Sequence, residues 1–162
     1  MKKKIHKILA CVDLSDFSSM VLEYSVELAQ DSHIVIYNVI NKLDVDAFKM
    51  VRKDFPGNVS VENFIKKLKT ERERLLKDLI KQHFFEQKSR MSFMIDVGVP
   101  SVQILRTVDK ENIDLIVMAN KGRGNLERIL FGSAAEKVFR HSPVPVVSVR
   151  DRKIFKRENS SC

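Results

Sequence analysis

The stretch from Lys7 to Ile40, KILACVDLSDFSSMVLEYSVELAQDSHIVIYNVI, contains the pattern that decides the fold. It opens and closes with short apolar runs, residues 7–12 and 33–40, which are typical of strands buried on both faces of a parallel sheet. Between them lie helix-capping residues from Asp13 onward and then apolar residues at nearly helical spacing up to Gln30. The stretch therefore predicts a strand, a helix and a second strand, joined by a right-handed crossover.

The same alternation continues to residue 149. We expect a long amphipathic helix from Val61 to His83, followed by strands and helices in turn at residues 90–97, 100–108, 113–118, 133–140 and 144–149. Residues 41–59 are the least regular part, with at most a short helical turn and then a loop. Five strands alternating with helices predict an α/β fold, a doubly wound five-stranded parallel sheet of order 3-2-1-4-5 with helices on both faces. Because Pro145 lacks an N–H group, the last strand is expected at a sheet edge.

Length and composition indicate one domain, at residues 1–150, followed by a basic C-terminal tail at 151–162. No apolar run approaches a membrane span and the N-terminus lacks the features of a signal peptide, so we expect a cytoplasmic protein without a membrane partner. Cys11 is interpreted as a small core residue and Cys162 as a free thiol. The Cys and His residues show no ligand-like spacing, so no metal site is predicted.

The formal net charge is +8, and much of it lies near the two ends of the chain. A basic balance can attract nucleic acid or an acidic membrane. No aromatic residues interleave with the basic ones, as a single-strand binder would require. We therefore interpret the charge as a solvated surface, and a nucleic-acid partner is not expected.

A second informative stretch follows the predicted strand 113–118: residues 119–133, ANKGRGNLERILFGS. Glycines at 122 and 132 let backbone N–H groups approach an anion, and a helix beginning after Gly132 would direct its free N–H groups at the same point. Lys121 and Arg123 are plausible phosphate partners, and Ser133 offers a hydroxyl. The alternatives are a turn with close helix packing for the glycines, solvated loop charges for Lys121 and Arg123, and a helix-capping role for Ser133.

In the predicted sheet order, this stretch lies beside Asp13 at the point where the strand order reverses, which is where such sheets bind ligands. A carboxylate beside a phosphate cradle indicates a nucleotide site, although a helix N-cap is an equally good interpretation of Asp13. The P-loop pattern and the Gly-x-Gly-x-x-Gly fingerprint are absent. No set of catalytic residues stands out, so at most slow nucleotide hydrolysis is expected.

Several motifs in this sequence resemble those of the universal stress protein (UspA) superfamily. They are KILACVD at 7–13, DVGVP at 96–100, DLIVM at 114–118 and, most specifically, Gly122-x9-Gly132-Ser133 followed by AAEKVFRHSPVPVV. The resemblance extends from about Lys4 to Arg150. In the ATP-binding branch of that superfamily the motif is Gly-x2-Gly-x9-Gly-Ser/Thr, and here Ala119 replaces the first glycine.

The resemblance implies that the chain binds ATP, with Mg²⁺ or Mn²⁺, and dimerises through its last strand, Val144 to Val149. It implies that Asp13 holds ribose and adenine, that the backbone of Val39 meets the adenine edge, and that Ala134 and its neighbours bind phosphate. The full predicted nucleotide-binding set is Val12, Asp13, Leu14, Val39, Met118, Ala119, Lys121, Gly122, Arg123, Gly132, Ser133 and Ala134.

Two functions are therefore carried forward from the sequence. The first is a cytoplasmic nucleotide-binding stress protein, a homodimer that acts as a switch or sensor. The second is a dimeric interaction protein of the same fold whose nucleotide site has lapsed, and the Ala119 replacement favours it. If position 119 requires a positive φ, alanine there would cost roughly 1 kcal/mol or more.

Overall fold

The computed structural model describes residues 4–54, 57, 59–120 and 132–150. Its strands are β1 (Lys7–Cys11), β2 (His33–Asn41), β3 (Met91–Gly98), β4 (Leu115–Ala119) and β5 (Val146–Val149). Its helices are α1 (Phe17–Ala29), α2 (Lys42–Asp54), α3 (Val61–His83), α4 (Pro100–Lys110) and α5 (Ser133–His141), with a 3₁₀ helix, η1, at Phe85–Arg90. Among these helices, none combines the length and apolar character needed to cross a membrane.

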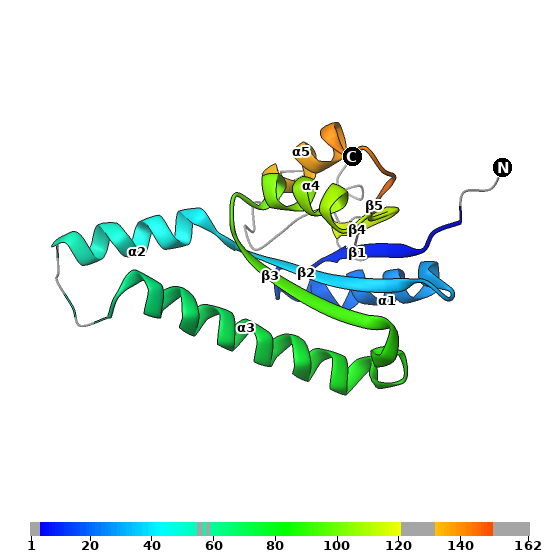
Figure 1. Cartoon of the computed structure of the whole chain (residues 1–162), viewed down its shortest axis with the longest axis horizontal. Coiled ribbons are helices and arrows are strands. Elements are labelled where there is room, and N and C mark those ends of the chain that lie inside the picture. Colours follow the sequence, from blue (N-terminus) through cyan, green and yellow to red (C-terminus); the bar gives the residue numbers. More distant parts are fainter. Residues whose placement is uncertain (1–3, 55–56, 58, 121–131, 151–162) are drawn as a thin grey trace, which may run out of the picture.

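The five described strands form one parallel sheet with the order β3-β2-β1-β4-β5, which confirms the predicted fold class and strand order (Figure 1). β1 lies at the centre, and β3 and β5 form the two edges. The chain moves from β1 through β2 to β3 on one side and then returns past β1 to β4 and β5. The strand order therefore reverses beside β1.

Helices cover both faces of the sheet (Figure 1). Alternate side chains of each strand point to opposite faces, so the sheet supplies two apolar cores. The first core lies between the sheet and the helices α1 and α3, and it includes the completely buried Ile8, Ile36, Leu22 and Leu76. The second core lies beneath α4 and α5 and includes Leu9, Tyr37, Ile104 and Val138.

The segment between β2 and β3 differs from our expectation. A 13-residue helix, α2, occupies most of the region in which a short turn and loop were predicted. The helix is stabilised by tertiary packing: Val45 is buried, and the ring of Phe48 stacks on that of Phe64 of α3 with centroids 3.9 Å apart. The sequence indicated this helix only weakly, because only one side of α2 packs against the rest of the molecule and few of its residues are buried. In Figure 1, α2 and the start of α3 extend beyond the sheet.

The last strand begins at Val146, two residues later than predicted. The N–H of Ile116 donates to the carbonyl of Pro145 (3.0 Å), and the N–H of Asn120 donates to that of Val149 (3.1 Å). Main-chain groups alternate in direction along a strand, so Pro145, Val147 and Val149 face β4. Val146 and Ser148 consequently direct their N–H and C=O groups to the open edge. Pro145 precedes the strand, and its missing donor lies on the β4 side.

Asp114 fixes the relative position of β1 and β4 where the two strands begin. Its carboxylate oxygen Oδ2 accepts the N–H groups of His6 (2.8 Å) and Lys7 (3.1 Å). The N–H of Asp114 in turn donates to the Lys7 carbonyl at 2.9 Å. One residue thus sets the register of the central strand pair.

We expect Asp114→Ala to lower the free energy of unfolding by roughly 1–2 kcal/mol, because two strand-entry N–H groups lose a charged acceptor. Urea denaturation measures the change. Asp109→Ala, at an exposed position on α4, is the control and should stay within about 0.5 kcal/mol of the wild type. Equal losses in the two variants would contradict the role given to Asp114.

Candidate functional site

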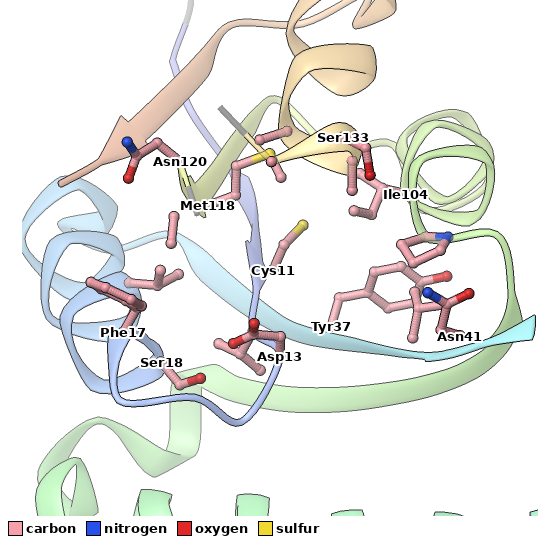
Figure 2. A pocket seen from close by; sticks show the side chains of 18 of the residues that line it. Cys11, Asp13, Phe17, Ser18, Tyr37, Asn41, Ile104, Met118, Asn120 and Ser133 are labelled. Carbon is pink, nitrogen blue, oxygen red and sulfur yellow. The ribbon is translucent and has the colours of Figure 1, made fainter. Parts of the chain in front are cut away.

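A cavity of about 630 Å³ opens beyond the carboxyl ends of β1 and β4 (Figure 2). Its volume lies within the range of small-molecule sites. Residues from most of the surrounding elements line it, including Asp13 after β1, Tyr37 and Val39 of β2, and the first residues of α5. The cavity coincides with the reversal of the strand order, where doubly wound sheets bind ligands.

Asp13 lies on one wall of this cavity and is not the N-cap of α1. That helix begins at Phe17 with Asp16 in the capping position, so the alternative interpretation of Asp13 is wrong. The Asp13 Oδ1 atom accepts hydrogen bonds from the Ser15 N–H (3.0 Å) and the Ser15 hydroxyl (2.5 Å). These bonds close a tight turn that holds the half-buried carboxylate toward the cavity (Figure 2).

Leu14 has a positive φ of 62° within this turn. A leucine in the left-handed region costs roughly 1–2 kcal/mol, and such strain often occurs at functional sites. The side chain of Leu14 packs against the core beneath α1 and is not among the residues that line the cavity. The structure therefore separates Leu14 from the other described members of the predicted set.

The N-terminus of α5 lies on the opposite wall. The helix begins at Ser133 with Gly132 as its N-cap, so Ser133 is not the cap, and the N-cap residue itself has no side chain to satisfy the first N–H groups. The Gly132 N–H donates to the Asn120 carbonyl (2.8 Å), which joins the start of α5 to the end of β4. Gly132 has a φ of −67°, so what glycine contributes there is the absence of a side chain. Gly132, Ser133 and Ala134 all line the cavity.

Ala119, the departure from the glycine motif, is the last residue of β4 and pairs with Val149 of β5. Its φ is not positive: the described non-glycine residues with positive φ are Leu14, Gln30 and Asn112. An alanine in strand conformation has no backbone penalty. The physical reason for expecting a lapsed site at this position is therefore absent.

The direction of the Val39 backbone follows from hydrogen bonds earlier in β2. The His33 N–H donates to the His6 carbonyl, and the Val12 N–H donates to the Tyr37 carbonyl, both at 2.9 Å. His33 and Tyr37 therefore face β1, and the two-residue period turns the main-chain groups of Val39 to the same side. Because β1 has already ended at Cys11, these groups face the cavity instead of a strand.

Arg72, a buried residue of α3, joins this wall to the Asp13 turn. Its Nη1 atom donates to the Asn38 side-chain oxygen (2.6 Å) and to the Val39 carbonyl (3.1 Å). The amide nitrogen of Asn38 donates to the carbonyl of Val12 at 2.8 Å. Since Val12 precedes Asp13, one buried network sets the positions of both the Val39 backbone and the Asp13 turn.

Two more ionisable side chains line the cavity between its ends. Cys11 projects into it from β1, half-buried where the sequence suggested a core residue (Figure 2). Burial raises the pKa of the Cys11 thiol, so the thiol stays protonated and weakly nucleophilic at neutral pH. The Tyr37 hydroxyl donates to Asp96 Oδ2 (2.7 Å), and burial raises the pKa of Tyr37 as well.

The structure brings most of the described members of the predicted set into one cavity. They are Val12, Asp13, Val39, Met118, Ala119, Gly132, Ser133 and Ala134. Lys121, Gly122 and Arg123 lie outside the described residues.

Three residues of the site were not predicted from the sequence: Tyr37, Asn38 and Arg72. Arg72 had a signal, because it interrupts the apolar stripe of α3 midway between Leu68 and Leu76. Tyr37 and Asn38 lie within an apolar strand, and nothing in the sequence pattern there indicated a role at the site.

The sequence was also compared with protein families and with other proteins. A family model described as the universal stress protein family matches residues 4–150. Universal stress protein MJ0577 of Methanocaldococcus jannaschii is 29% identical over 162 residues, covering 95% of this chain and 96% of that protein. Universal stress protein MJ0531 of the same organism is 32% identical over 147 residues, covering 91% and 83%.

Solved structures share the fold. The structure of MJ0577 matches with a TM-score of 0.75 at 23% identity and covers 91% of this chain and 97% of that one. A universal stress protein in complex with cAMP matches with a TM-score of 0.61 at 17% identity and covers 91% and 98%. The family match over nearly the whole described fold, together with the relative that is 32% identical, leads to one conclusion: this chain belongs to the universal stress protein family.

Proposed function

We propose that the chain binds ATP, with Mg²⁺ or Mn²⁺ accompanying the triphosphate, and acts as a dimeric switch or sensor in the stress response. One observation carries the proposal: a single cavity places the Asp13 carboxylate opposite the N-terminus of α5, whose N-cap residue is a glycine. A carboxylate suits ribose hydroxyls, and a helix N-terminus suits phosphate. The domain proposed for this function is residues 1–150.

The three parts of a nucleotide have complementary groups along the cavity. The main-chain N–H of Val39 supplies a donor for the base edge, and its C=O, which accepts from Arg72, has a second lone pair to offer as an acceptor. Asp13, on the wall opposite the start of α5, can accept hydrogen bonds from the ribose. The structural relative in complex with cAMP supports a nucleotide in this fold, since cAMP also combines adenine, ribose and phosphate.

A dimeric interaction protein without a nucleotide is the second candidate. Its support was Ala119, and the strand conformation of that residue removes the expected strain. The decisive experiment is calorimetric titration of the full chain with ATP and Mg²⁺, together with nucleotide-resolving chromatography of the denatured, purified protein. Absence of nucleotide from the extract and of binding heat in the titration would leave the second candidate.

We expect Gly132→Val to weaken ATP binding at least about tenfold, or 1.4 kcal/mol, because an isopropyl group would occupy the approach to the first N–H groups of α5. Gly57→Val is the matched control, because a Cβ added at Gly57 has no atoms within 4 Å. Calorimetry gives the affinities, and circular dichroism verifies the fold. Equal ATP affinity in the two variants would refute the phosphate site.

Arg72→Met should lower the free energy of unfolding by roughly 1–3 kcal/mol, because the Asn38 and Val39 oxygens lose a buried donor. It should also weaken ATP binding, because Asn38 holds the carbonyl of Val12, next to Asp13. Arg74→Met is the control: Arg74 lies on the same helix but pairs only at the surface with Asp78. Urea denaturation and calorimetry measure the two effects. Unchanged ATP affinity in folded Arg72→Met would show that the network does not set the site.

The proposed dimer pairs β5 with its symmetry mate, because the described structure leaves this strand at an open edge. Ser148→Pro should abolish this pairing and halve the mass of the wild-type assembly: it removes an N–H directed to that edge and leaves the bonds to β4 in place. Light scattering on both proteins tests the interface. A monomeric wild type, or a Ser148→Pro variant that still dimerises through the same edge, would contradict the proposal.

A further inference from the structure

Helix α2 carries two apolar faces, and the protein uses only one of them. Val45 and Phe48 face the rest of the molecule, where the ring of Phe48 stacks on that of Phe64. On the other side lie four exposed residues that we name the outer stripe, Leu43, Ala47, Met50 and Val51. Leu43 is 71% exposed, Met50 70% and Val51 61%.

The spacing of the outer stripe is that of a helix seam. Its members lie at positions i, i+4, i+7 and i+8, which places them on one side of a helix and side by side along its length. Scattered apolar residues on a surface need no explanation, whereas a continuous stripe of this kind normally meets a partner. The α2 helix also extends beyond the sheet, so nothing in the described fold covers the stripe (Figure 1).

The charges of α2 indicate what kind of partner fits. Its first half, residues 42–47, has one basic and two acidic side chains, and its second half, residues 48–54, has three basic and one acidic. A second α2 helix packed antiparallel would place the acidic half of each helix against the basic half of the other. Antiparallel packing also opposes the two helix dipoles. A parallel arrangement would bring like charges together.

Asp46 shows how the charges flank the outer stripe. Its carboxylate pairs with Lys42 (3.9 Å) and Lys49 (3.2 Å) along the edge of the stripe, and all three side chains are solvent-accessible. Packing the stripes together would therefore bury apolar carbon while these charges stay in water at the rim. This arrangement of apolar centre and polar rim is the one found at protein interfaces.

We propose that the outer stripe of α2 is an interface with a second copy of this chain, formed by antiparallel packing of two α2 helices about a twofold axis. This surface is distinct from β5, because β5 is an edge strand of the sheet and α2 continues from the carboxyl end of β2 and extends beyond the sheet (Figure 1). The two surfaces together would join dimers into a larger assembly. Asp44, in the first turn of α2, lines the candidate nucleotide cavity, so the interface would begin next to that site.

Disulfide trapping tests the geometry. In a Cys162→Ser background, Ala47→Cys should form a disulfide-linked dimer under mild oxidation, because Ala47 lies near the middle of the stripe and would face its own copy. Glu23→Cys, exposed on α1, is the matched control and should remain unlinked. Equal linking at the two positions, or none at Ala47→Cys, would overturn the antiparallel arrangement.

Light scattering over a concentration series tests the association itself. Met50→Glu should halve the limiting mass of the wild type, and Val102→Glu, 47% exposed on α4, should not change it. The same comparison in a Ser148→Pro background separates this interface from β5, because association through α2 should persist there. An unchanged mass in Met50→Glu would overturn the proposal. So would binding of anionic phospholipid vesicles that Met50→Glu abolishes with no change of mass.

Discussion

The early end of the central strand is the constraint on which the site depends. β1 stops at Cys11, whereas β2 continues to Asn41 and β4 extends past the partner of Cys11 to Ala119. The main-chain groups of β2 beyond Tyr37 therefore lose their strand partner on the β1 side. Backbone groups in a protein interior require hydrogen-bond partners, so this gap must be occupied by side chains, water or a ligand. The cavity is the space beyond the end of β1, between the longer strands on either side of it.

The protein fills part of this gap from a distant element. Arg72 reaches from α3 to the Val39 carbonyl and, through Asn38, to the carbonyl of Val12. A buried guanidinium is costly unless it is fully engaged, so the network also restricts how α3 can pack on the sheet. These hydrogen bonds connect the segment between β2 and β3, which contains α2 and α3, to the cavity wall. The same segment carries the exposed stripe of α2, so the Arg72 network and the exposed stripe both belong to the segment between β2 and β3.

The sheet could be predicted from the sequence because each strand and each crossover is indicated by its own short stretch of residues. Each strand is a short apolar run, and each crossover must be right-handed, so few arrangements remain. The prediction failed where local pattern was weak. Helix α2 carries apolar residues on two sides and packs through the buried Val45 and the Phe48–Phe64 stack, so its periodicity did not resemble that of a core helix. The network of Arg72 and Asn38 joins residues 34 positions apart, a contact that no periodicity encodes.

By itself, the sequence determined the α/β class, the strand order, the family resemblance and the segments that meet at the site. It did so because the spacing of apolar residues and the positions of glycine and proline influence the conformation of only a few neighbouring residues, so they can be interpreted locally. Only the tertiary structure decided the conformations on which the chemistry depends. It placed Asp16 instead of Asp13 at the N-cap position of α1, placed Ala119 in strand conformation, and left Leu14 outside the cavity. These outcomes depend on where β1 ends relative to its neighbours, and that is set by pairing between strands far apart in the chain.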